Sequence, residues 1–344
     1  MSEANGVTSV SAGSASAASI KSPVLARLTS KQRKNIIGVA VVLILTMFVF
    51  PALLSTFWIK VLTQVAYYAV VAGGLGLLYG RVGLASLGQV ALLGVGAWVT
   101  MRLSFLYHWP FPILMLIAGT VCAIFGLLIG LPALRLSGLY LALVTLMFGA
   151  AFSVVITTLK FPTGGPGFKG LVKDTTQRKI MTRPSMAIGE SAYFRYVVVV
   201  CFLMFLLFVV HLVSKPGRAW ASIGQSEAAA LAAGVNTMVY KLWAFAMVSF
   251  ATGVAGALLA ADVNSPSPNI FSPDASLILM AVVIMAGYRS LWGALGAGLL
   301  ARFMGEFLKD HGVSDRIGLM LFGLGVAFNL VISTRAMKKK GLIS

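Results

Sequence analysis

Few residues in this sequence have the types and spacing that catalysis needs. The three histidines, His108, His211 and His311, lie far apart, and neither a metal-ligand cluster nor a nucleophile paired with a base accompanies them. The sequence has no G-x-x-x-x-G-K-[ST] phosphate-binding loop, so we do not expect this chain to hydrolyse ATP. Cys122 and Cys201 both fall inside apolar runs, which favours small buried side chains over a disulfide. We therefore expect neither an enzyme nor a metal site nor a cofactor in this chain.

The composition is that of a chain surrounded by lipid. Of the 344 residues, 59% are hydrophobic and only 10% are charged, and the mean hydropathy is +0.94, which is far from the values of soluble domains. Several runs are continuously apolar over the ~20 residues that a helix needs to cross a membrane, whereas β-barrel strands would alternate. The clearest runs are 36–54, 62–79, 113–134, 139–159, 196–212 and 242–261. This pattern predicts an all-α polytopic membrane protein.

The charges favour a particular orientation in the membrane. Residues 1–35 are rich in Ser and Ala and strongly basic, which predicts a disordered cytoplasmic tail, with an organellar transit peptide as the alternative. Residues 36–334 form the expected transmembrane domain, and 335–344 a second basic cytoplasmic tail. Both termini are placed inside by the bias of Lys and Arg toward cytoplasmic loops, although the expected outer loop 160–193 is basic too. The net charge of +18 fits basic helix flanks better than nucleic-acid binding, because no soluble domain is present to form a basic groove.

The number of crossings depends on three weaker segments. Segment 87–100 begins with polar residues and is short, so we expect a broken or re-entrant helix there, followed by Arg102 at an outer interface. Segments 277–287 and 291–308 flank Arg289, which is too costly at mid-bilayer and therefore predicts a turn near a surface. With a last run at 317–332, the bundle has about ten transmembrane helices, or eight if the pair around Arg289 is re-entrant.

Polar residues inside the membrane are few. Those at predicted membrane depth are Gln64, Gln89, Asn329, Arg302 and Glu306. Arg302 and Glu306 are spaced i, i+4, which predicts a mutual ion pair. Gln89, next to Ser86, suits either a hydrogen bond to a polar solute or one between helices.

The acidic residues and glycines are also informative. The predicted outer loops contain Asp262, Asp274, Asp310 and Asp315, which leaves little for proton coupling within the membrane. Glycines recur inside the apolar runs, where they let helices approach closely or bend. Examples are the glycines at 73, 74, 76, 94, 96, 126, 130, 253 and 256.

The most informative polar stretch is 217–241, between two apolar runs. Ser226 suits an N-cap, Glu227 suits the positive end of a helix dipole, 228–233 are mostly helix formers, and Gly234 suits a left-handed C-terminal turn. The pattern predicts a short capped cytoplasmic helix. Such a helix is either a docking element for a groove on a soluble partner or a plain connector.

Here the sequence resembles the inner-membrane permeases of ATP-binding-cassette importers, in the LivM-like branch that serves branched-chain amino acids, urea and amides. The segment from Glu227 through Ala229 and Ala230 to Gly234 resembles the loop that docks on the ATPase in that family. Other similar stretches are 73–78 running to 88–91, 134–142, 163–167 and 290–293. The clearest departure is Tyr288 and Arg289, where relatives tend to have a glycine-rich turn.

The resemblance implies a permease subunit that moves solute inward by alternating access, in a bacterial inner membrane. It implies ATP bound by separate ATPase subunits, a second permease, and an extracytoplasmic solute-binding protein. Whether the two permeases form a homodimer or a heterodimer stays open. Branched-chain amino acids are the expected solute, with urea or amides and an ion-coupled secondary carrier as the alternatives. The residues expected to couple to the ATPase are Gly217, Arg218, Glu227, Ala229, Ala230, Gly234 and Lys241. Those expected along the substrate passage are Ser86, Gln89, Thr163, Gly164 and Gly165.

Overall fold

The computed structural model describes residues 37, 38, 41, 45, 47–107, 109–133, 139–158, 170–171, 178–179, 183–185, 187–264 and 266–312. Both predicted basic tails, the last apolar run 317–332 and the passage residues Thr163, Gly164 and Gly165 lie outside the described residues. The apolar run 36–54 is described only in part.

Within the described residues, six helices are long and apolar enough to cross a membrane. They are α2 (Thr56–Leu77, continued by the π-helical turn η2, Leu78–Val82), α3 (Gln89–Tyr107), α4 (Phe111–Ala133), α5 (Leu139–Thr158), α6 (Glu190–Val213) and α9 (Thr237–Val263). The shorter helical elements are α7 (Lys215–Gln225), α8 (Glu227–Ala232), η3 (Pro268–Phe271), α10 (Pro273–Ala286), α11 (Leu291–Gly298), η4 (Leu299–Phe303) and α12 (Met304–Asp310). Strands β1 (Gly170–Leu171) and β2 (Arg178–Lys179) form one antiparallel pair. The predicted all-α polytopic membrane fold is confirmed.

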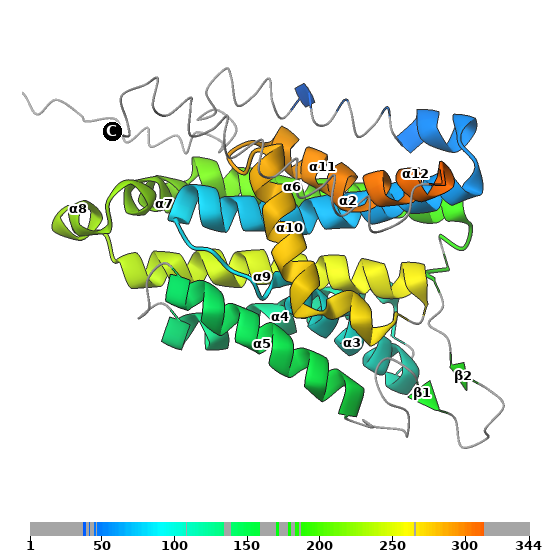
Figure 1. The fold of residues 1–344 in the computed structure, drawn as a ribbon, viewed down its shortest axis with the longest axis horizontal. Helices are drawn as coiled ribbons and strands as arrows, with labels where there is room; N and C mark the ends of the chain where they lie inside the picture. Colours follow the sequence, from blue (N-terminus) through cyan, green and yellow to red (C-terminus); the bar gives the residue numbers. More distant parts are fainter. Residues whose placement is uncertain are drawn as a thin grey trace, which may run out of the picture.

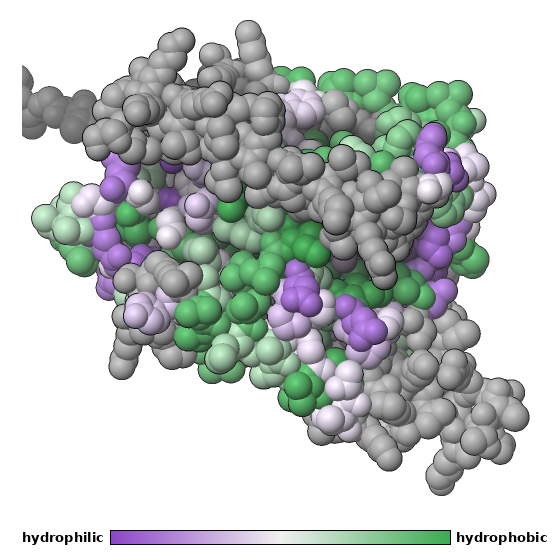
Figure 2. Space-filling view, viewed as in Figure 1, coloured by the Kyte–Doolittle hydropathy of each residue, from purple (hydrophilic) through white to green (hydrophobic). Residues whose placement is uncertain are grey.

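Helix α9 is the centre of the bundle. It packs against α4, α3 and α2, and 89% of its most apolar stretch is buried, against 28% for α5. In Figure 1, α2 and α9 run side by side along the length of the bundle, while α7 and α8 project from one end. Apolar residues cover much of the face over α5 and α10 in Figure 2, as expected of a surface that meets lipid.

Glycines allow α9 to pack backbone against backbone. A Cβ at Gly96 of α3 would lie 2.5 Å from the carbonyl oxygen of Gly253, and one at Gly256 would meet the carbonyl oxygen of Leu93. A side chain at either glycine would force the axes of α3 and α9 apart. The predicted close approach at these glycines is confirmed.

Two predictions about the ends of helices were wrong. Segment 87–100 is not a short broken helix, because α3 continues to Tyr107 and is long enough to cross. Arg102 lies within α3, where its side chain is buried and its Cζ lies 5.8 Å from the centroid of the Trp98 ring. Asp262 does not lie in a loop but in the last turn of α9, where it is 1% exposed. For Asp262, the Arg183 cation and the Tyr67 hydroxyl, which come from distant parts of the chain, make the burial possible.

The predicted turn between 287 and 291 is confirmed. Helix α10 ends at Ala286, Gly287 has a φ of 97°, and Ser290 Oγ accepts a hydrogen bond from the Trp292 N–H at 3.2 Å. Tyr288 fits because glycines face it. A Cβ at Gly76 would lie 2.7 Å from the Tyr288 carbonyl oxygen, and one at Gly80 would lie 2.6 Å from its ring. The departure from the family pattern at Tyr288 is therefore accommodated by close packing against α2 and η2.

Arg302 has a partner that its spacing did not predict. Its Nε donates to Gln64 Oε1 of α2 at 2.9 Å, which joins η4 to α2 inside the bundle. A hydrogen bond to a charged group is stronger than one between neutral groups. Two of the predicted intramembrane polar residues thus bind each other across the fold.

Candidate functional site

Residues 215–241, here called the connecting module, comprise α7, α8 and the start of α9. Ser226 Oγ accepts a hydrogen bond from the Ala229 N–H at 3.3 Å and so caps α8. At the other end, Gly234 has a φ of 77°, and the N–H groups of Gly234 and Val235 donate to the carbonyl oxygens of Leu231 and Ala230 at 2.9 and 3.0 Å. This is the paired hydrogen bonding of a Schellman C-cap. The prediction of a short helix capped at both ends is confirmed.

The connecting module is fixed to the end of the bundle. Trp220 of α7 is fully buried, and its indole Nε1–H donates to the Tyr240 carbonyl oxygen at 2.7 Å. A Cβ at Gly224 would meet the carbonyl oxygen of Arg81, so α7 packs closely against η2. Lys241 Nζ forms an ion pair with Glu227 Oε1 at 2.6 Å, which ties α8 to α9. A displacement of the module would therefore act on both α2 and α9.

A polar contact lies inside the bundle where α3 begins. Residues 83–88 are not helical, and Ser86 and Gln89 are 2% and 1% exposed. Gln89 Oε1 accepts a hydrogen bond from Thr252 of α9 at 2.9 Å, while its Nε2 has no partner within the described part of the chain. The Leu87 N–H donates to Thr145 Oγ1 of α5 at 2.9 Å. Gln89 thus makes the hydrogen bond between helices that was one of its two predicted roles.

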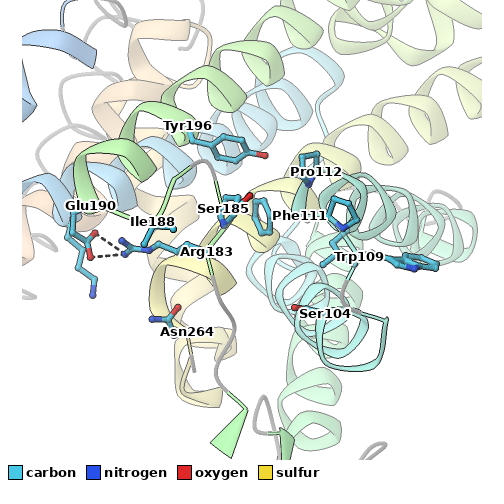
Figure 3. A pocket seen from close by; sticks show the side chains of 14 residues that line it. Ser104, Trp109, Phe111, Pro112, Arg183, Ser185, Ile188, Glu190, Tyr196 and Asn264 are labelled. Atoms are coloured by element: carbon cyan, nitrogen blue, oxygen red, sulfur yellow. Dashed lines mark hydrogen bonds and ion pairs between the residues drawn. The ribbon is translucent and has the colours of Figure 1, made fainter.

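A pocket of about 980 Å³ opens at the end of the bundle opposite the connecting module, here called the pocket end. Its lining combines charged residues with apolar and aromatic ones (Figure 3). The residues are Lys60, Ser104, Trp109, Pro110, Phe111, Pro112, Leu114, Arg183, Pro184, Ser185, Ile188, Glu190, Tyr196 and Asn264. A pocket of this size is within the usual range for small-molecule sites.

Arg183 connects the acidic groups at this end. Its Nη2 lies 2.8 Å from Glu190 Oε1 at the start of α6 and 3.6 Å from Asp262 Oδ1 at the end of α9. Tyr67 donates its hydroxyl to Asp262 Oδ2 at 3.3 Å, and the Arg183 guanidinium lies over the ring of Tyr193, 4.7 Å from its centroid. The buried carboxylate of Asp262 is therefore paired with a cation and hydrogen-bonded.

Comparison with known proteins identifies the family. The family model described as "Branched-chain amino acid transport system / permease component" matches residues 57–330, which is most of the chain. The chain belongs to this family. Two similar proteins are the high-affinity branched-chain amino acid transport system permease proteins LivM of Escherichia coli (strain K12) and of Salmonella typhimurium. Each is 29% identical over 322 residues, covering 88% of this chain and 74% of the relative. No solved structure matches the chain.

The predicted coupling residues of this permease divide into two groups. Gly217, Ala230 and Lys241 are buried and hold the module on the bundle, whereas Arg218, Glu227, Ala229 and Gly234 are exposed. Leu231, Met238 and Val239 are exposed beside them, at 55%, 44% and 56%. The module therefore presents both apolar and charged side chains away from the bundle.

Sequence reasoning missed the pocket. Arg183 was counted among the cations of the expected outer loop 160–193 and Asp262 was placed in another expected outer loop, so their pairing was not foreseen. One usable signal was present: Asp262 directly follows the unbroken apolar run 242–261. An acid at the end of such a run is costly in lipid unless a cation or a hydroxyl accompanies it.

Proposed function

We propose that this chain is the membrane-spanning permease subunit of an ABC importer that moves branched-chain amino acids inward by alternating access. A separate ATPase drives the cycle, and a second permease and an extracytoplasmic solute-binding protein complete the assembly. The connecting module and both termini are cytoplasmic, and the pocket end faces outward, in a bacterial inner membrane. The observation that supports this most is the connecting module, which is a capped helix tied to the central helix of the bundle.

The proposed coupling acts through contacts already described. The ATPase docks on α8 and on the exposed apolar residues Leu231, Met238 and Val239. The Lys241–Glu227 pair and Trp220 transmit its movement to α9. Because α9 packs backbone to backbone on α3, both helices move as one body, and access changes between the two ends.

Two measurements test the proposal. The chain is reconstituted in vesicles with its ATPase, partner permease and binding protein, and uptake of labelled leucine and labelled urea is followed with and without ATP. We expect leucine uptake that depends on ATP and on the ATPase. Uptake of urea alone would point to the urea and amide branch instead.

Docking is tested by co-purification with the ATPase. Glu227→Lys and Leu231→Ser should both reduce co-purification at least tenfold, while Asp310→Lys, an exposed charge reversal at the end of α12, should leave it unchanged. Leu231→Ser keeps the Glu227–Lys241 pair intact and so separates docking from the folding of α8. Co-purification that survives both changes would contradict the coupling role.

One observation favours an ion-coupled carrier as a second candidate. Asp262 is a buried carboxylate in a membrane-spanning helix, the kind of group that proton-coupled carriers use. Leucine uptake by the lone chain under a proton gradient, without ATP, would support that candidate over the importer subunit.

A further inference from the structure

We propose that the pocket receives a zwitterionic α-amino acid with an aliphatic side chain. This proposal rests on the proposed function and assigns the substrate of the permease to a site. Arg183 and Lys60 bind the α-carboxylate, Glu190 binds the α-ammonium, and the apolar wall contacts the side chain.

The charges match a zwitterion. Arg183 and Glu190 line the pocket together and form an ion pair at 2.8 Å (Figure 3), and Lys60 adds a second positive charge to the pocket lining. An α-amino acid carries its carboxylate and its ammonium on one carbon, so it can exchange partners with this pair. Its carboxylate then binds Arg183 and its ammonium binds Glu190, and no charge is left unpaired in a partly desolvated site.

Arg183 remains in place when Glu190 changes partner. Asp262 lies 3.6 Å from its guanidinium with a fully buried side chain, and the ring of Tyr193 lies beneath it. The side chain of Arg183 is 11% exposed, against 26% for Glu190, so the cation is the more firmly held member of the pair. A guanidinium fixed in this way binds a carboxylate through two parallel hydrogen bonds without first losing its own freedom.

The rest of the lining is apolar. Phe111, Leu114 and Tyr196 face the pocket as buried or half-buried side chains, and Trp109 and Ile188 extend this surface toward solvent. In Figure 3, Phe111 and Trp109 lie across the pocket from Glu190 and Arg183. An amino acid oriented by Arg183 and Glu190 therefore directs its side chain toward carbon atoms, which suits a branched aliphatic group.

This arrangement discriminates between solutes. Urea and simple amides carry no charge, so they cannot compensate Arg183 or Glu190 once that pair is separated. A basic amino acid would bring a second cation close to Lys60, which disfavours it. Of the solutes that the family resemblance suggested, the pocket fits the branched-chain amino acids best.

Protection of an engineered cysteine tests the proposal. The native Cys122 and Cys201 are buried, so a membrane-impermeant thiol reagent should react mainly with an introduced cysteine. Ser185→Cys places an exposed thiol in the pocket lining, and Asp310→Cys places one on α12, outside the pocket lining. The labelling rate is measured on the complete reconstituted transporter with leucine, leucinamide, 4-methylpentanoate or urea outside.

We expect leucine to slow the labelling of the Ser185→Cys variant at least threefold and to leave that of Asp310→Cys unchanged. Leucinamide, which lacks the carboxylate, and 4-methylpentanoate, which lacks the ammonium, should protect much less, and urea not at all. Adding Glu190→Gln or Arg183→Lys to Ser185→Cys should abolish protection, and each alone should raise the KM for leucine uptake at least tenfold.

The outcomes separate this inference from the proposed function. The pocket assignment alone would be overturned if the transporter imports leucine with ATP, but leucine does not protect the pocket cysteine and the KM is unchanged in Glu190→Gln and Arg183→Lys. Equal protection by leucine and leucinamide would overturn the role of Arg183. Absence of ATP-dependent leucine import by the unmodified complex would instead count against the proposed function.

Discussion

The central helix α9 carries an ion pair at each end, and the two differ in their surroundings. Lys241 and Asp262 are 21 positions apart in the helix, which is roughly 30 Å at 1.5 Å per residue. At the connecting module, Lys241 pairs with Glu227, whose side chain is 50% exposed. At the pocket end, Arg183 pairs with Asp262, whose side chain is fully buried.

The difference indicates what each end is suited to do. A half-exposed acid can exchange its partner for one on another protein at small cost, because water screens the charge throughout. A buried acid that loses its cation has no such substitute. The connecting module is therefore suited to docking, whereas the buried acid at the pocket end holds a cation in a fixed position.

The largest expected effect follows from removing the cation at the pocket end. Arg183→Ala removes the cation that lies 3.6 Å from the buried Asp262 carboxylate, and we expect a loss of about 3 to 5 kcal/mol of stability. Unfolding of the purified protein in detergent, followed by tryptophan fluorescence against denaturant, measures it. The double variant Arg183→Met with Asp262→Leu removes both charges and should lose less; a double variant as unstable as Arg183→Ala would contradict the buried-pair argument.

A smaller effect is expected between the two ends, at Gly256 of α9. Gly256→Ala places a methyl group against the Leu93 carbonyl oxygen, so α9 and α3 must separate, with an expected loss of about 1 to 3 kcal/mol. The matched control is Gly305→Ala on α12, where the new Cβ meets open space. The same unfolding assay should give a clearly lower free energy of unfolding for Gly256→Ala than for Gly305→Ala. Equal stability of the two would mean that the backbone contact does not limit the packing of α9.

At the connecting module, the C-cap of α8 should matter less. Gly234→Ala puts a side chain on a residue with a φ of 77°, which is expected to destabilise α8 by ~1 kcal/mol. Gly189→Ala serves as control because Gly189 has a φ of −79° and open space around its Cβ. Hydrogen exchange of the α8 amides should accelerate in the first variant only. Unchanged exchange would argue against a rigid capped helix.

The smallest effect on stability is expected at the exposed ion pair. Glu227→Gln should change the free energy of unfolding by less than about 1 kcal/mol, since the acid is half exposed. Raising the salt concentration should reduce even that difference. A loss as large as that of Arg183→Ala would remove the contrast between the two ends.

The features that sequence reasoning predicted well are local ones. Ser226 and Gly234 define α8 through hydrogen bonds to residues within five positions, so their types alone reveal the caps. The long apolar runs likewise predicted the crossing helices, because length and hydropathy suffice in lipid.

What could not be predicted depends on residues far apart in the chain. Arg302 was expected to pair with Glu306, four positions away, but it binds Gln64, which is 238 positions away. The pairing of Arg183 with Asp262, 79 positions away, is of the same kind. The periodicity of one segment does not indicate which distant helix will supply a partner. The role of Ser86 and Gln89 along the substrate passage stays a prediction.

Among the described residues, Lys60, Arg183 and Glu190 of the pocket lining, together with Asp262 in contact with Arg183, are two positive and two negative groups. A zwitterion that binds there adds no net charge, and its release removes none. Moving one elementary charge through a membrane potential of 100 mV involves about 2.3 kcal/mol, whereas a zwitterion carries no net charge through it. In the proposed importer, the membrane voltage would then neither drive nor oppose the passage of solute, and the direction of import would rest on the partner ATPase alone.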